Sequence, residues 1–194
     1  MKISNVITTF VFAVVVTFSG FAQDFSKLDK SPMDRAYYPE NAPKRAFAKS
    51  EKQKKQLEPQ IRVTYSRPAK KGRTIFGGLL KYGEKWRIGA NESTEILFEN
   101  DVTFGGKTIK AGRYSAIITP TESEWTLTLN TGLDGWGNYG YDDSLDVVSV
   151  SAPVSKSDKE LEHLSITLYE ASKNTVHLKI GWDTSVAEFP ITLK

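Results

Sequence analysis

Cationic side chains that could bind an anion gather in one glycine-rich stretch, residues 61–92. Its guanidinium groups are those of Arg67, Arg73 and Arg87, and the polar pair Asn91-Glu92 closes the stretch. A guanidinium fork matches the paired oxygens of a carboxylate, sulfate or phosphate group. Nearby glycines allow backbone amides to approach a ligand. The pattern therefore predicts an anion-binding rim formed by these five residues.

Internal ion pairs are the alternative use of the same arginines. Arg67 and Arg87 could pair with Glu84, Glu92 or Glu95 and so order a long loop across the open end of the fold. Arginines closed by carboxylates would indicate a scaffold, whereas arginines that face a solvent-filled pocket would indicate binding. The sequence leaves both interpretations open.

Aromatic rings form a second candidate site in residues 130–143. Trp136, Tyr139 and Tyr141 lie there among glycines and short polar side chains. Flat rings can stack on a sugar face while Asp and Asn side chains bond its hydroxyl groups, so Trp136 and Tyr139 join the predicted ligand-binding residues. The alternative is a packed loop whose rings cover the edge of the fold. The aspartates nearby lack the alternating spacing of a calcium-binding loop, and we assign no metal site.

Catalysis through common nucleophiles or metals finds little support in the sequence. The chain has no cysteine, and its two histidines, His163 and His177, fall on the polar side of alternating segments. It contains neither the Gly-x-Ser-x-Gly motif of hydrolases nor a phosphate-binding Gly-Lys-Ser or Gly-Lys-Thr sequence. We therefore assign no catalytic residue and no cofactor.

The first 22 residues have the composition of a secretory signal peptide. Lys2 precedes an apolar run over residues 6–16, and Gly20-Phe21-Ala22 has the small-x-small pattern of a cleavage site after Ala22. That run is too short for a permanent membrane span and no later segment is apolar enough, so we predict no transmembrane segment. We expect an exported protein, periplasmic or secreted, for which nucleic acid is a poor partner.

Apolar residues recur at every second position in many segments after residue 60, which is typical of strands with one buried face. The segments are 61–66, 96–98, 114–118, 125–129, 145–150, 164–168, 176–182 and 186–193, and Gly105-Gly106 predicts a tight hairpin turn. Short strands without long helices between them predict an all-β fold, a jelly-roll-like antiparallel β-sandwich. We expect this single domain over residues 60–194. A charged N-terminal arm or linker at residues 23–59, with a short helix at 48–57, extends along it.

Three sequence blocks in one order carry a family resemblance. They are Tyr65-Ser66-Arg67-Pro68, then Gly72-Arg73-Thr74-Ile75-Phe76-Gly77, and finally Trp86-Arg87-Ile88-Gly89-Ala90-Asn91-Glu92. With these blocks the chain resembles the exported bacterial family called domain of unknown function 2911, over about residues 31–194. The resemblance implies export and one mainly-β domain, and it implies no activity.

These patterns favour a non-catalytic ligand-binding module of the bacterial envelope. Its partner would be a glycan, a small anionic ligand or an anionic envelope polymer. One alternative is a carboxylate-dependent polysaccharide-acting enzyme, with Glu92 as first candidate and Glu95, Asp134 or Asp142 as a second carboxylate. Another is a structural envelope protein whose basic segment at 44–55 contacts anionic lipopolysaccharide.

Overall fold

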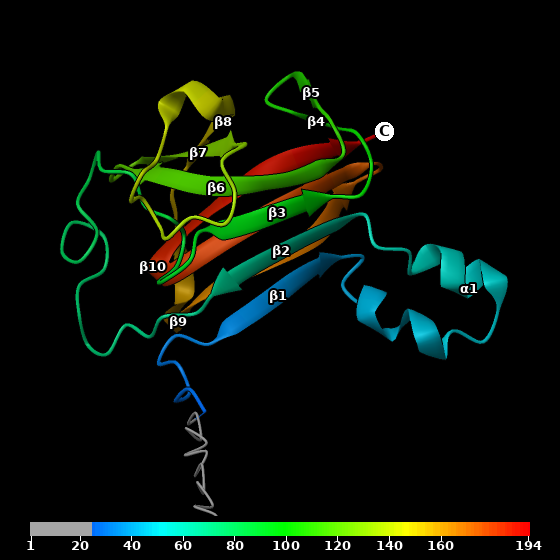
Figure 1. The fold of residues 1–194 in the computed structure, drawn as a ribbon, viewed down its shortest axis with the longest axis horizontal. Helices are drawn as coiled ribbons and strands as arrows, with labels where there is room; N and C mark the ends of the chain where they lie inside the picture. Colours follow the sequence, from blue (N-terminus) through cyan, green and yellow to red (C-terminus); the bar gives the residue numbers. More distant parts are fainter. Residues whose placement is uncertain (1–24) are drawn as a thin grey trace, which may run out of the picture.

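The protein is two antiparallel β-sheets packed face to face, which confirms the predicted β-sandwich (Figure 1). The computed structural model describes residues 25–194, and the predicted signal peptide at residues 1–22 lies outside this range. The larger sheet has the order β1 (Met33–Tyr38), β2 (Ile61–Ser66), β3 (Thr94–Phe98), β6 (Gly112–Pro120), β7 (Glu124–Asn130) and β8 (Asp146–Pro153). The smaller sheet has the order β5 (Lys107–Ile109), β4 (Val102–Phe104), β10 (Thr175–Leu193) and β9 (Ser155–Ser172).

The core lies between the two sheets and is built from the inward side chains of the alternating segments. Val63 of β2, Leu127 of β7 and Ile180 of β10 are all at most 1% exposed. Burial of such side chains removes apolar surface from water, which is the main favourable contribution to folding. Trp125 and Trp182 are the largest fully buried side chains among the described residues.

The strand β10 folds back on itself, so that it accounts for two of the predicted strands, 176–182 and 186–193. Asp183 adopts the left-handed conformation at the bend, with a φ of 58°. The two arms then run side by side, and the amide of Leu193 donates to the carbonyl of Asn174 at 2.8 Å. The start of β9 passes the same bend, where Lys156 pairs with Ser185.

The strand β1 was not predicted, because its side chains do not alternate between the core and solvent. Ala36 is its one buried residue. It nevertheless pairs with β2 over its whole length, from Met33 opposite Ser66 to Tyr38 opposite Ile61. Part of the segment predicted as an arm therefore forms the edge strand of the larger sheet.

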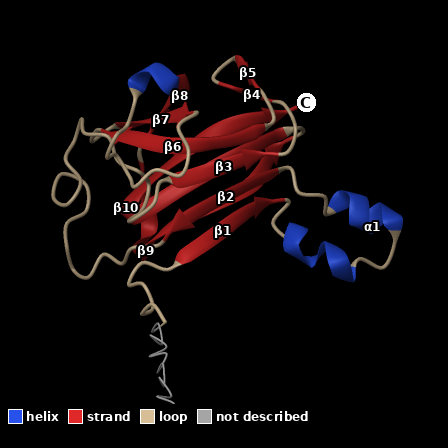
Figure 2. Cartoon of the chain, in the orientation of Figure 1, coloured by secondary structure: helices blue, strands red, loops and turns tan. Residues whose placement is uncertain are grey.

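Two short local elements follow their sequence patterns, and two 3-10 helices were not predicted. The hairpin between β4 and β5 turns at Gly105 and Gly106, whose φ values of 56° and 75° suit the tight turn predicted there. The short helix α1 (Glu51–Gln56) begins after Ser50, whose side chain caps it, and it buries no residue. The 3-10 helices are η1 (Ala42–Phe47) and η2 (Asp143–Leu145). Figure 2 shows that the helices lie outside the two sheets.

A long loop, residues 67–93, bridges the two sheets at one end of the sandwich (Figure 1). Near its start, the carbonyl of Pro68 accepts from the amide of Leu164 in β9 at 3.1 Å. Near its end, the amide of Trp86 donates to the carbonyl of Ile118 in β6 at 2.7 Å. The loop is therefore fixed to both sheets. Within residues 25–194, no helix is long and apolar enough to span a membrane.

Candidate anion-binding site

Aromatic rings form a rigid base beneath the bridging loop. Trp86 of the loop stacks on Trp182 of β10, with 5.9 Å between ring centroids and 22° between ring planes. The rings of Phe76 and Trp86 meet in a T-shaped arrangement, with 5.9 Å between their centroids. The indole N–H of Trp86 donates to Gly89 O and that of Trp182 to Glu162 O, both at 3.2 Å. Both rings are buried and their polar groups are satisfied, so the pair forms a fixed base for the loop.

A cavity of about 280 Å³ opens above this base. Its charged lining residues are Arg73 and Arg87, and no acidic residue of the described range lines it. Two of the predicted ligand-binding arginines thus face one cavity without a counter-charge in its wall. The lining residues are Ser31, Pro68, Arg73, Leu79, Leu80, Trp86, Arg87, Gly89, Ala90 and Trp182.

Arg87 is half-buried, and its guanidinium has no partner within residues 25–194. It makes no hydrogen bond or ion pair with any residue of the described range, and its Nε is fully buried. Gly137 of the 131–142 loop covers it, since a Cβ at Gly137 would lie 2.9 Å from the Arg87 Cζ. A buried donor without an acceptor costs about 1–3 kcal/mol, and more when it is charged. The position of Arg87 therefore suits an anion that the protein itself does not provide.

Arg73 is held in place without losing its charge. Its Nε donates to Lys70 O at 2.8 Å and its Nη2 donates to Ala69 O at 2.7 Å. Both acceptors are neutral carbonyl oxygens, and Nη1 has no partner in residues 25–194. The guanidinium is thus oriented beside the cavity and keeps one nitrogen for a ligand.

Arg67 lies elsewhere and is fully engaged within the protein. It donates to Asp34 Oδ2 at 2.9 Å, to Leu164 O at 3.0 Å and to Ser165 Oγ at 3.0 Å. These bonds tie the end of β2 to β1 and β9. Internal pairing therefore describes Arg67, although its partner is Asp34 rather than Glu84, Glu92 or Glu95.

The charge of Lys70 is also balanced by carboxylates of the protein. Its ammonium contacts Glu160 at 2.6 Å and Asp183 at 2.7 Å. Hydrogen bonds to Asp183 and then Glu160 raise the pKa of Lys70 above its ordinary value. Of the cations in the stretch, Arg73 and Arg87 are those that the structure brings to the cavity.

Glu92 faces a different cavity, of about 290 Å³, together with Glu95 and Asp134. The latter two carboxylates both accept from Arg113, at 2.7 and 2.9 Å. These hydrogen bonds raise the pKa of the Arg113 guanidinium. Asn91 adopts the left-handed conformation, with a φ of 61°, and lines neither cavity. The structure therefore separates Asn91 and Glu92 from the two arginines.

The aromatic residues of the 131–142 loop divide into two groups. Trp136 and Tyr139 are 56% and 78% exposed, so neither covers the edge of the sandwich. Tyr141 instead donates its hydroxyl to Asp146, and partial burial together with this bond raises its pKa. Ser93 anchors the loop by donating to Gly135 O and Gly137 O, both at 3.0 Å. Trp136 and Tyr139 thus remain available as exposed rings, outside the arginine cavity.

Sequence reasoning missed Trp182 as a wall of the cavity. The alternating pattern predicted a strand that ends at Trp182, but nothing in the pattern shows that its ring meets Trp86. No group of three His, Asp or Glu side chains within residues 25–194 is arranged to hold a metal ion.

Comparisons with known proteins identify a family and nothing further. Residues 48–191 match the family model described as "Protein of unknown function (DUF2911)". No curated protein and no solved structure matches the chain.

Proposed function

The chain belongs to the DUF2911 family of proteins of unknown function, and from its geometry we propose that it is a non-catalytic binding protein for an anionic ligand. The ligand would place its anionic group between Arg73 and Arg87 in the 280 Å³ cavity. The observation that carries this proposal is the half-buried Arg87, whose guanidinium lacks an acceptor among the described residues.

The lining of the cavity narrows the chemical class of the ligand. The two guanidiniums can take a carboxylate, sulfate or phosphate through paired hydrogen bonds. Leu79 and Leu80 present apolar surface next to them, above the buried rings of Trp86 and Trp182, which suits a ligand with an apolar body. The cavity is near the lower end of the range for small-molecule sites, roughly 300–1,000 Å³. One acidic unit of a glycan or a small aromatic acid fits these conditions.

An array of carboxylated and sulfated glycans, followed by calorimetric titration, tests the proposal. Wild type should bind at least one member, and the Arg73→Ala/Arg87→Ala variant should lose that binding. Arg35→Ala is the matched control, because Arg35 is an exposed arginine on β1 that does not line the cavity. Equal binding by wild type and the double variant, with unchanged melting temperatures, would overturn the proposal.

We propose that binding takes place in the bacterial envelope. The support is the composition of residues 1–22, with Lys2 ahead of an apolar run and a small-x-small sequence ending at Ala22. Cell fractionation with N-terminal sequencing should recover a periplasmic or secreted chain that begins at Gln23. A cytoplasmic chain that begins at Met1 would contradict this location.

One observation favours an enzyme as the second candidate. Glu92, Glu95 and Asp134, three of the four carboxylates considered for glycoside hydrolysis, line one cavity. That chemistry needs one carboxyl group that gives a proton and another that acts as base or nucleophile. Because Arg113 occupies both Glu95 and Asp134, Glu92 is the carboxylate left free for such a role.

A further inference from the structure

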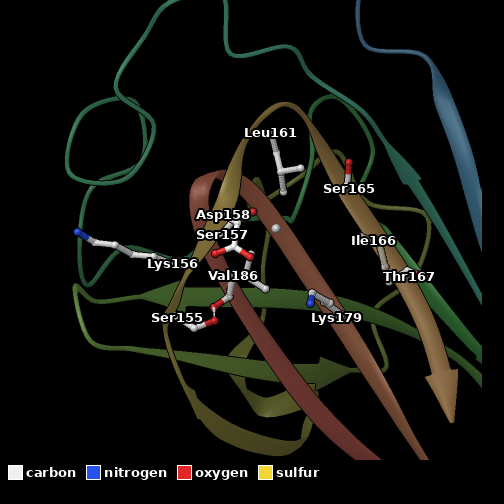
Figure 3. A pocket seen from close by; sticks show the side chains of 11 residues that line it. Ser155, Lys156, Ser157, Asp158, Leu161, Ser165, Ile166, Thr167, Lys179 and Val186 are labelled. Atoms are coloured by element: carbon white, nitrogen blue, oxygen red, sulfur yellow. Dashed lines mark hydrogen bonds between the residues drawn. The ribbon is translucent and has the colours of Figure 1, made fainter. Parts of the chain in front are cut away.

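A second cavity lies where the start of β9 wraps around the bend of β10, and it was not expected from the sequence. It encloses about 330 Å³ and opens beside the outer face of the smaller sheet (Figure 3). Gly181 forms part of its floor with bare backbone, because a Cβ there would lie 2.8 Å from Leu161 Cδ1. Leu161 and Val186 add apolar surface to the same cavity. We call it the β9–β10 groove.

Several polar groups of the groove have no partner within residues 25–194. The hydroxyl of Thr167 and the carboxylate of Asp158 make no hydrogen bond or ion pair there. Ser157 Oγ accepts from the amide of Lys159 at 3.3 Å, and its own proton has no protein acceptor. By contrast, Ser165 is fully used, since it donates to His163 O at 3.0 Å and accepts from Arg67. The groove thus offers two hydroxyl groups and one carboxylate to a ligand.

Lys179 points into the groove and is fixed there by a cluster on the outer face of the sheet (Figure 3). Its ammonium lies 2.9 Å from Glu188 Oε1, while Glu188 Oε2 accepts from Tyr169 and lies 3.0 Å from His177 Nδ1. Partial burial alone would raise the pKa of Glu188, but hydrogen bonds from Tyr169, His177 and Lys179 outweigh it and lower the pKa to about 2. Glu188 is therefore a permanent anion at neutral pH, and Lys179 keeps two N–H groups for other acceptors.

The charges in the groove are balanced. The carboxylate of Glu188 offsets Lys179, and Lys156 and Asp158 carry one charge of each sign. Lys156 extends away from the groove in Figure 3. An anion gains little from such a site, whereas a neutral molecule with many hydroxyl groups can donate to Asp158 and accept from Lys179. Hydroxyl side chains can do both, so they adapt to either orientation of a ligand hydroxyl.

We propose that the β9–β10 groove binds a neutral sugar ring. Ring hydroxyls bond to Asp158, Thr167 and Lys179, and the C–H face of the ring packs on Leu161 and Val186. This site is separate from the arginine cavity, because the two cavities share no lining residue. The two sites also differ in ligand charge, so they can be tested independently.

Protein-observed NMR with free glucose, galactose and mannose tests the proposal on the chain from residue 23 onward. We expect at least one of these sugars to cause saturable shifts of the backbone amides of Ser157, Thr167 and Gly181. The amides of Gly89 and Ala90 in the arginine cavity should stay unchanged. Glycerol, which has hydroxyl groups but no ring face, should bind at least about tenfold more weakly, a difference that corresponds to about 1.4 kcal/mol.

Matched variants separate binding from folding. Thr167→Val and Lys179→Met should each weaken sugar binding several-fold, since each removes a hydrogen-bonding group. Thr126→Val, on the outer face of the larger sheet, and Lys173→Met, an exposed lysine between β9 and β10 that does not line the groove, should bind like wild type. If no sugar shifts the groove amides, or if all four variants bind equally, the groove is not a sugar site. If the same amides show that glucuronate binds more tightly than glucose, the proposal of a neutral ligand is wrong.

Discussion

The ring of Trp86 lies stacked against the ring of Trp182, with their centroids 5.9 Å apart. This contact joins the bridging loop to the smaller sheet and forms the base of the arginine cavity. Because the two residues come from distant parts of the chain, the cavity exists only when the loop and β10 are both folded.

The first prediction concerns this stack. Trp86 is only 6% exposed, so Trp86→Ala should lower the free energy of unfolding by about 3–5 kcal/mol. Trp136→Ala is the control, because Trp136 is 56% exposed; its cost should stay within about 0.5 kcal/mol. Urea unfolding measures the free energy of unfolding of both variants. If both lose the same amount, the stack of Trp86 on Trp182 does not stabilise the fold.

Arg67 and Arg87 should respond in opposite ways to substitution. Arg67→Ala removes three hydrogen bonds and should cost about 1–2 kcal/mol of stability, while ligand binding persists. Arg87→Ala removes a cation without a protein partner, so stability should stay the same or rise, while binding is lost. Thermal unfolding and calorimetric titration measure the two effects. A large loss of stability in Arg87→Ala would indicate a structural role for its guanidinium.

Two glycines of the 131–142 loop provide a matched pair. Gly137 and Gly140 have φ values of 70° and 71°. Substitution of either residue by alanine should therefore lower the free energy of unfolding by about 1 kcal/mol through backbone strain. A Cβ at Gly140 meets nothing within 4 Å, whereas one at Gly137 collides with Arg87. Gly137→Ala should therefore also displace the guanidinium and weaken anion binding, and Gly140→Ala should not. Identical binding by the two variants would contradict the proposed role of Arg87.

Stability should fall at acid pH because of Glu188. Its pKa is lowered from 4.5 to about 2 in the folded protein, so it stabilises the fold fully above pH 4.5 and loses this contribution as the pH falls towards 2. The full contribution is up to about 3 kcal/mol. Glu188→Gln should therefore destabilise the protein near neutral pH but hardly at the acid end. Urea unfolding between pH 2 and 7 measures the stability difference between wild type and Glu188→Gln. A difference that does not change with pH would show that Glu188 does not cause the loss of stability at acid pH.

The enzyme alternative has its own test. If Glu92 were catalytic, Glu92→Gln should abolish turnover of some member of a polysaccharide panel without lowering the melting temperature. We expect no turnover by wild type, because Arg113 holds Glu95 and Asp134. Turnover by wild type that is lost in Glu92→Gln would favour the enzyme over the binding protein.

The sequence was a good guide to strands that have one buried and one exposed face. Ile61, Val63 and Tyr65 alternate with polar residues and mark β2 to the residue. An edge strand such as β1 buries only Ala36, so it carries no such pattern. For this reason the partner of Arg67 could not be found: Asp34 becomes its neighbour only through the pairing of β1 with β2.

The candidate sites depended on contacts that local patterns do not contain. Arg73 and Arg87 were identified by their residue type and the glycines around them, and they do meet at one cavity. His177 and Glu188 are eleven positions apart in sequence. The bend of β10 at Asp183 places them together, and a periodic pattern broken by a bend does not specify the pairing of its two arms. The β9–β10 groove depends on that same bend and was therefore missed.

The position of β10 also bears on how the chain folds during synthesis. This strand lies in the interior of its sheet, between β4 and β9, so the sheet cannot close until β10 has been synthesised and has left the ribosome. Until then the nascent chain exposes the apolar face of the larger sheet, a state prone to aggregation. Loss of even a few residues from β10 should therefore yield insoluble protein rather than a smaller soluble domain.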